Sequence, residues 1–272
     1  MNIMNAIDID RRQTDVASRQ YFLNAPFDQI DQAAVLDLAA GADPNSRFRY
    51  IVTPNADHVV RLNREPSLRP YYEDAWLTLC DSKPISLFAH ARSREMTHVT
   101  GSDLTVSLFR TVIQKADRIT LIVGNREIGE AVRAAYPGVD FRIHVPPFGL
   151  LKNLEAQREC VEFALRGKAS FIFIAVGSPQ SEKIAHMLSK ESSATGIGLC
   201  VGASLEFLVG AKTRAPMWMQ RLSLEWLHRL ITDPKRLWRR YVFGAWPLIM
   251  LFSREIMGHH SNAKIFRASP HR

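Results

Sequence analysis

The sequence of 272 residues predicts an α/β fold built on a mostly parallel sheet. Short apolar runs rich in β-branched residues recur along the chain, and a stretch of helical character follows each of them. The runs show little alternation of polar and apolar residues, which is typical of strands buried on both faces. With 46% hydrophobic and 23% charged residues, the composition is that of an ordinary folded protein and excludes a disordered or low-complexity chain.

The expected elements alternate regularly. We expect strands at 50–53, 119–123, 141–145, 171–176 and 197–201. Helices are expected at about 56–74, 102–116, 126–136, 152–166 and 179–192. Such alternation implies right-handed crossovers between parallel strands, and ligands of these sheets bind at the carboxyl ends of the strands.

The positive charge is concentrated at the C-terminal end. Residues 212–272 hold 12 Lys and Arg against 3 Asp and Glu, a net +9, whereas the whole chain carries +8. We therefore divide the chain into a body, 1–211, and a basic, Trp-rich appendage, 212–272. Basic residues, tryptophans and the apolar run at 241–252 favour an anionic membrane surface as its partner. Packing on the core and nucleic-acid binding are the alternatives, and the bulky apolar residues disfavour nucleic acid.

Several classes of protein are excluded or disfavoured. The three cysteines are far apart, which argues against a disulfide framework or a zinc site. Residues 1–12 lack the apolar core of a secretory signal, and no stretch of about 18 apolar residues predicts a membrane span. We therefore expect a cytoplasmic protein. The G-x-G-x-x-G fingerprint of dinucleotide enzymes, the P-loop and the G-x-S-x-G elbow are also missing.

Polar residues follow two of the expected strands and one further apolar run. Thr53 and Asn55 can hydrogen-bond a sugar or phosphate, or can simply cap the next helix. Asp81 closes an apolar run and can act as a general base, or can form a turn. Gly177 allows a ligand to approach the backbone, whereas Ser178 with Glu182 also fits a plain helix cap.

Five short motifs follow one another along the chain: Thr53-Pro54-Asn55, Thr100-Gly101-Ser102-Asp103-Leu104, Pro146-Pro147-Phe148-Gly149, Gly177-Ser178-Pro179 and Arg214-Ala215-Pro216-Met217-Trp218. Read together, these motifs resemble the bacterial WecG/TagA/CpsF glycosyltransferase family. The resemblance runs from about Thr53 to Tyr241 and is strongest in the segment 202–241. No single motif is specific, but their combination is.

The resemblance implies a fold and an activity. It implies a Rossmann-like domain with a basic C-terminal appendage that engages the inner face of the cell membrane. It also implies an inverting, metal-independent hexosyltransferase that needs no cofactor. The donor would be a UDP-sugar and the acceptor a polyprenyl-diphosphate-linked sugar used for cell-surface polysaccharide. Self-association is reported for the family, and we retain it as an expectation.

The resemblance also assigns roles to residues. The family's base falls on Asp81, here in Cys-Asp-Ser-Lys-Pro without the glycines of the family motif. Other pocket positions fall on Thr53, Asn55, His98 (usually arginine), Gly177, Ser181 (usually glutamine), Glu182 and Glu206 (usually aspartate). Contacts with the acceptor diphosphate, which suit guanidinium groups, fall on Arg214, Arg221 and Arg229.

The transferred sugar stays open at this point. The departures at Ser82, Lys83 and His98 favour an exopolysaccharide enzyme, such as the glucosyltransferase of a xanthan-like pathway. An N-acetylmannosamine (ManNAc) or ManNAc-uronate transferase of teichoic acid or common antigen type is the alternative. A nucleotide-binding oxidoreductase and a non-catalytic membrane or nucleic-acid adaptor are the competing classes.

Overall fold

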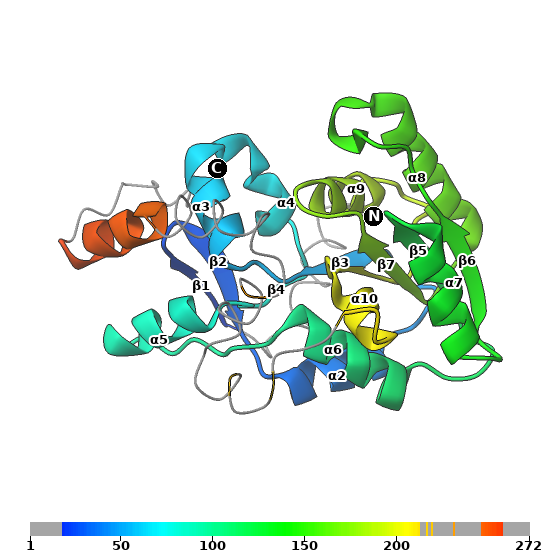
Figure 1. The fold of residues 1–272 in the computed structure, drawn as a ribbon, viewed down its shortest axis with the longest axis horizontal. Coiled ribbons are helices and arrows are strands. Elements are labelled where there is room, and N and C mark those ends of the chain that lie inside the picture. The colour runs from blue at the N-terminus through cyan, green and yellow to red at the C-terminus, as the bar shows by residue number, and fades with distance from the viewer. Residues whose placement is uncertain (1–17, 213–215, 217–218, 220–230, 232–245, 258–272) are drawn as a thin grey trace, which may run out of the picture.

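The computed structural model describes residues 18–212, 216, 219, 231 and 246–257. Its main sheet contains β3 (Arg49–Val52), β4 (Leu77–Thr78), β5 (Arg118–Val123), β6 (Asp140–His144), β7 (Phe171–Ala175) and β8 (Ile197–Cys200). In the described part of the chain these strands are all parallel and lie in the order β4-β3-β8-β7-β5-β6. Figure 1 shows β7, β5 and β6 side by side at one end of the sheet. The predicted α/β class is confirmed, and each of the five expected strands is present.

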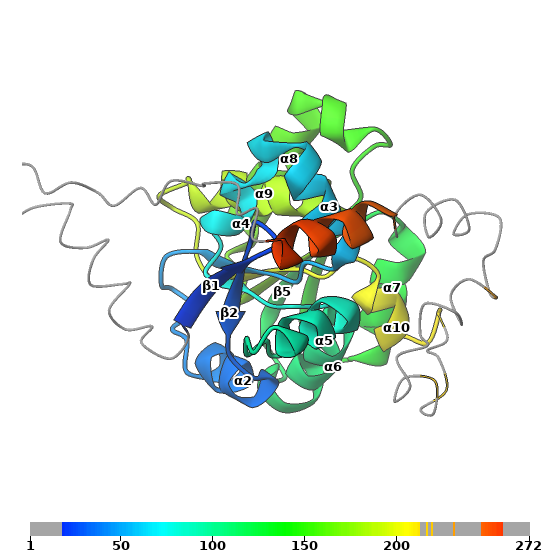
Figure 2. The same ribbon diagram turned by 90° about the vertical axis from the view of Figure 1, so that its left-hand side faces the viewer.

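Helices cover both faces of this sheet, as Figure 2 shows. One face carries α3 (Ala56–Arg64), α4 (Pro70–Glu73), α8 (Leu154–Gly167) and α9 (Gln180–Ser189). The other carries α2 (Gln32–Ala40), α6 (Gly101–Ser107), α7 (Arg126–Ala135) and α10 (Ser204–Leu208). The two faces explain the apolar strand sequences. In β7, Ile172 and Ile174 pack into one core while Phe171 and Phe173 pack into the other.

Prolines divide the helix that we expected at 56–74. Pro66 begins a 3₁₀ turn, η1 (Pro66–Leu68), and Pro70 begins α4, since proline fits the first turn of a helix but not its interior. The helix expected at 102–116 is also shorter. It consists of α6 followed by a π-helical turn, η2 (Leu108–Val112). After α4 the chain enters β4, a strand of two residues that the sequence analysis did not identify.

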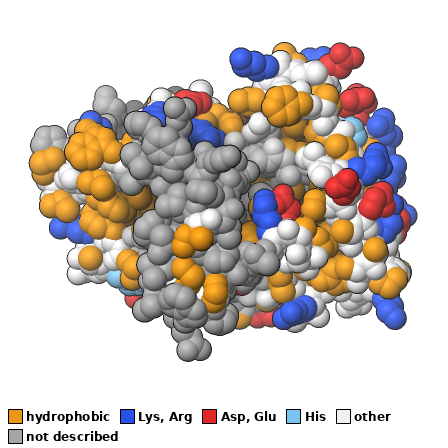
Figure 3. Space-filling view, in the orientation of Figure 1, with side chains coloured by type: hydrophobic (Ala, Val, Ile, Leu, Met, Phe, Trp, Pro, Cys, Tyr) orange, Lys and Arg blue, Asp and Glu red, His pale blue; other side chains and the backbone are white. Residues whose placement is uncertain are grey.

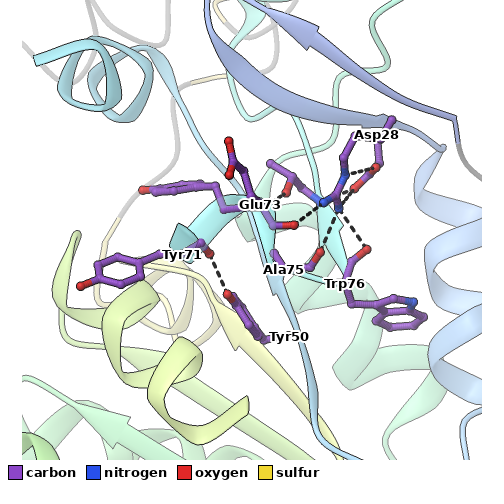
Figure 4. Close-up of polar contacts among 9 residues, drawn as sticks. Asp28, Tyr50, Tyr71, Glu73, Ala75 and Trp76 are labelled. Atoms are coloured by element: carbon purple, nitrogen blue, oxygen red, sulfur yellow. Dashed lines mark hydrogen bonds and ion pairs between the residues drawn. The ribbon is translucent and has the colours of Figure 1, made fainter. Parts of the chain in front are cut away.

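The sequence analysis also missed an N-terminal hairpin. It pairs β1 (Ser18–Phe22) with β2 (Ala25–Gln29) in antiparallel register. The Arg19 guanidinium makes two 2.8 Å bonds to the Asp28 carboxylate and donates to the backbone oxygens of Glu73 and Ala75 (Figure 4). Asp28 also accepts from the Thr78 amide at 2.7 Å, so this buried carboxylate ties the hairpin to β4.

A C-terminal helical segment, 246–256, packs beside α5 (Lys83–Ala91). The Phe252 ring stacks on Phe88 with the centroids 4.0 Å apart, and Arg94 faces Glu255 at 3.5 Å. Its outer side remains apolar, and hydrophobic side chains gather over it on the left of Figure 3. The exposed ones are Trp246, Ile249, Met250, Ile256 and Met257. Within the described residues, no helix combines the length and the hydropathy that a membrane span requires.

Candidate active site

The carboxyl ends of β3 and β8 form a switch point, where the chain changes sides of the sheet; the region beyond these ends is called the crevice below. β3 and β8 are neighbours, with Val52 opposite Cys200 in the register. After β3 the chain enters α3 on one face, whereas after β8 it enters α10 on the other. A crevice at the carboxyl ends of such strands is the usual ligand site of an open α/β sheet.

Thr53 lies at the bottom of this crevice. Its side chain is buried, and its hydroxyl donates to the Cys200 carbonyl at 3.4 Å. A Cβ atom on Gly101 would lie 2.8 Å from the Thr53 Oγ1 and 3.4 Å from the Ser204 Oγ. The absence of a side chain at Gly101 therefore brings the start of α6 directly against the ends of β3 and β8.

Asp81 is fixed at the same place. Its backbone amide donates to the Pro54 carbonyl at 3.1 Å, which joins the end of β4 to the end of β3. Its carboxylate Oδ2 accepts from the Gly101 amide at 3.1 Å. The half-buried carboxylate therefore sits at the N-terminus of α6 with a defined orientation, beside Thr53. The next residue, Ser82, caps α5 through the Ile85 amide.

Asn55 serves as a helix cap, one of the two roles the sequence left open. Its Oδ1 accepts from the amides of Asp57 and His58 at 3.0 and 3.4 Å. The His58 ring returns the contact, because its Nδ1 accepts from the Asn55 amide at 2.9 Å. This reciprocal capping box fixes the loop between β3 and α3, and it orders Asn55 at the edge of the crevice.

The loop after β7 forms the opposite wall. Gly177 has φ +86°, and within the described residues no atom lies within 4 Å of a Cβ placed there, so its backbone is open to a ligand. The proposed Ser178 cap is wrong: Pro179 precedes α9, and the Ser178 Oγ instead accepts from Arg61 at 3.4 Å. The buried Ser181 turns inward, and its hydroxyl accepts from the Val176 amide at 3.3 Å.

Glu182 lies beneath this loop and is almost fully buried. Only 4% of the residue is exposed, and its Oε2 has no hydrogen-bond partner among the described residues. Burial raises the pKa of Glu182 to about 7, although the Ser178 hydroxyl and the Arg61 guanidinium act in the opposite direction. Burial likewise raises the pKa of the Cys200 thiol on the adjacent strand. The site therefore contains two carboxylates in contrasting environments, Asp81 at the crevice and Glu182 below it.

The remaining expected residues lie further out or outside the described residues. Glu206, in α10, forms an ion pair with Lys212. His98 is exposed, and its backbone pairs with that of Cys80 beside Asp81. The three arginines assigned to the acceptor diphosphate, Arg214, Arg221 and Arg229, lie outside the described residues.

The sequence analysis overlooked three residues of the site. Both His58 and Arg61 lie on α3: His58 faces Glu182 in the first turn of α9, and Arg61 reaches Ser178 in the loop after β7. Their positions in the first and second turns of the helix that follows β3 are the signal that could have identified them. Gly202, directly after β8, has φ +53°, and in the described structure nothing lies within 4 Å of a Cβ built on it. It offers a second backbone surface that a ligand can approach.

The arrangement suits acid–base chemistry on a ligand held by backbone groups. It offers an oriented carboxylate, a buried hydroxyl and two open glycine turns at one sheet edge. Among the described residues, no group of three or more His, Cys, Asp and Glu side chains is placed to hold a metal ion.

Comparison with known proteins agrees with this geometry. Residues 20–262 match the description "Glycosyl transferase WecG/TagA/CpsF family". The chain belongs to this family. The match begins inside β1 and includes every strand of the main sheet and the segment beside α5.

Curated relatives from Staphylococcus aureus are similar to the chain over most of its length. Proteins of strains MRSA252 and NCTC 8325 are each 26% identical over 205 residues, which is 73% of this chain and 78% of theirs. Both are named N-acetylglucosaminyldiphosphoundecaprenol N-acetyl-beta-D-mannosaminyltransferase.

Proposed function

We propose that this glycosyltransferase moves ManNAc from UDP-ManNAc to a polyprenyl-diphosphate-linked N-acetylglucosamine, with inversion at the anomeric carbon. The names of the S. aureus relatives support this donor sugar and this acceptor. They give no support to the glucosyltransferase of a xanthan-like pathway that we expected from Ser82, Lys83 and His98. Teichoic acid or related surface polysaccharide synthesis is therefore favoured over exopolysaccharide synthesis.

The position of Asp81 is the observation on which the proposal depends. Its carboxylate is oriented by the Gly101 amide at the crevice between strand ends, where the acceptor hydroxyl would enter. Asp81 accepts the hydroxyl proton while that oxygen forms its bond to the anomeric carbon. The bond between this carbon and the diphosphate oxygen breaks, and the electron pair leaves with UDP.

The leaving diphosphate needs stabilisation because it gains negative charge in the transition state. We assign this role to open backbone groups at Gly177 and Gly202 and to the appendage residues Arg214, Arg221 and Arg229. Thr53, Asn55 and Ser181 lie on the loops around the crevice, and Glu206 and His98 lie at its rim. We place the nucleotide near Gly177 and Glu206, and the acceptor near His98 and the appendage.

We further propose that residues 212–272 hold the body, 1–211, on the inner face of the cell membrane. The exposed apolar side chains of the helical segment 246–256 support this role. Exposed apolar side chains on a helix, within a segment rich in Lys and Arg, are typical of proteins that lie on a membrane surface. The lipid acceptor would then reach the crevice without leaving the membrane. Self-association of the chain remains part of this proposal.

Transfer assays with Asp81→Asn test the catalytic assignment. A panel of UDP-sugars is offered with a short-chain polyprenyl-diphosphate N-acetylglucosamine, in EDTA, and products are read by mass spectrometry. We expect one added N-acetylhexosamine from UDP-ManNAc with the wild type. Asparagine retains the bond to the Gly101 amide but cannot take a proton, so kcat should fall by about 10²–10⁴.

Asp37→Asn is the matched control, because Asp37 is exposed on α2, on the body of the protein. It should leave turnover unchanged. Full activity of a folded Asp81→Asn variant would remove Asp81 from the mechanism. Preferential transfer of glucose would reject ManNAc, and the absence of transfer by wild type from every donor, even with native membranes, would favour the adaptor class.

A further inference from the structure

Glu182 connects the two loops that border the crevice. It lies in the first turn of α9, directly below the loop that carries Gly177 and Ser178. Its Oε1 also faces the Nε2 of His58, on the other side of the crevice, at 3.9 Å. With 4% of its surface exposed, it has no room to contact a substrate itself.

The His58 ring has a defined tautomer in this arrangement. A backbone amide can only donate, so the Nδ1 that accepts from Asn55 carries no proton. The ring proton of the neutral form therefore lies on Nε2 and points toward the Glu182 carboxylate. A negative charge on Glu182 favours this tautomer and thereby favours the capping box that orders Asn55.

Ser178 gives Glu182 its second connection. The Ser178 oxygen accepts from the Arg61 guanidinium at 3.4 Å, and the hydroxyl and the guanidinium both lower the pKa of Glu182 against the effect of burial. The same hydroxyl lowers the pKa of the buried Tyr72 of α4, against the rise that burial causes. The loop after β7 is thus joined to α3 and α4 through groups that surround one buried carboxylate.

We propose that Glu182 is a positioning residue, which holds the Asn55 loop through His58 and the Gly177 loop through Ser178 in the arrangement that binds the donor. The inference rests on the proposed function of this crevice as the donor site. Glu182 then acts on donor affinity rather than on the chemical step, because neither loop carries the base Asp81.

The proposal predicts a pH dependence. Among the described residues, the titratable and charged groups that interact with Glu182 are His58 and Arg61 from α3, Tyr50 from β3, Tyr72 from α4 and Cys200 from β8. Burial raises the pKa of Tyr72 and of Cys200, so both remain neutral around pH 7. Since the pKa of Glu182 is raised by burial to about 7, its charge develops in this range, and donor binding should tighten as it does.

Steady-state kinetics of Glu182→Gln provide the test. Glutamine has the same shape but no charge, so the KM for the UDP-sugar should rise about tenfold at pH 8 while kcat stays within about twofold. The wild-type KM should fall between about pH 6 and pH 8, and the variant's KM should change less over this range. Glu162→Gln on the exposed side of α8 is the matched control and should behave as wild type.

The ¹⁵N resonances of the His58 ring give a second readout that needs no turnover. They are assigned with His58→Asn, which should also reproduce the rise in KM. In the wild type they should report the Nε2–H tautomer, and in Glu182→Gln that tautomer should be less populated. An unchanged tautomer together with an unchanged KM profile would overturn the proposal. If the wild type transfers no sugar, the proposed function fails, and the ¹⁵N comparison alone decides the role of Glu182.

Discussion

Replacing Glu182 by Gln should make the stability of the protein less dependent on pH. The folded state raises the pKa of this carboxyl from its ordinary 4.5 to about 7, because burial disfavours the charged form. Between these values the folded state binds more protons than the unfolded chain. The stabilising contribution of the protonated group is therefore complete below pH 4.5 and is lost as the pH rises toward 7.

The size of the effect follows from the same values. A rise from 4.5 to about 7, at about 1.4 kcal/mol for each pH unit, corresponds to about 3 kcal/mol of folding free energy. Glutamine carries no charge at any pH and does not lose this contribution. Relative to wild type, the variant should therefore gain about 3 kcal/mol between pH 4.5 and pH 8.

Urea unfolding of both proteins at a series of pH values measures this difference directly. Other titrating groups are common to both proteins and cancel in the comparison, provided that the m-values agree. Glu162→Gln, whose carboxylate is exposed in an i,i+4 pair on α8, should show a constant difference from wild type. A Glu182→Gln difference that stays constant across the range would refute the argument that burial controls this group.

Two glycine substitutions test the packing around the site. In Gly101→Ala the new Cβ would lie 2.8 Å from the Thr53 Oγ1, so kcat/KM should fall about tenfold as the Thr53 hydroxyl and the bond to Asp81 shift. Gly124→Ala, whose Cβ would meet no described atom within 4 Å, is its control and should retain activity. In Gly198→Ala the Cβ would lie 2.4 Å from the Phe48 ring, and thermal unfolding should show a loss of about 1–3 kcal/mol. Wild-type stability in this last variant would mean that the ring moves aside at no cost.

The sequence predicted the sheet well because its strands are buried on both sides. The run Phe171–Ala175 supplies side chains to two cores, which leaves no polar positions in its pattern. The missed elements lack such signals. β4 has only two residues, and the hairpin turns at Leu23 and Asn24 with positive φ and without the usual glycine.

The residues of the candidate site could be predicted from the sequence, but the contacts between them could not. Thr53 and Asp81 follow different strands, and they meet only because β4 lies next to β3 and Gly101 packs between them. The sequence pattern placed Glu182 in a polar first turn, where an acid is normally exposed. Its burial depends on α3 and α4 lying over the same face, a tertiary arrangement that a local pattern does not contain.

The stacking of Phe252 on Phe88 bears on how shortened forms of this enzyme are interpreted. Phe88 belongs to α5, the helix that begins two residues after Asp81. A chain cut before residue 246 uncovers this ring and breaks the contact between Arg94 and Glu255. Loss of activity on truncation would then combine two causes, loss of the proposed attachment to the membrane and loosening of the helix next to Asp81. Phe252→Ala in the full-length chain separates them, because it removes the support of α5 and retains the rest of the appendage.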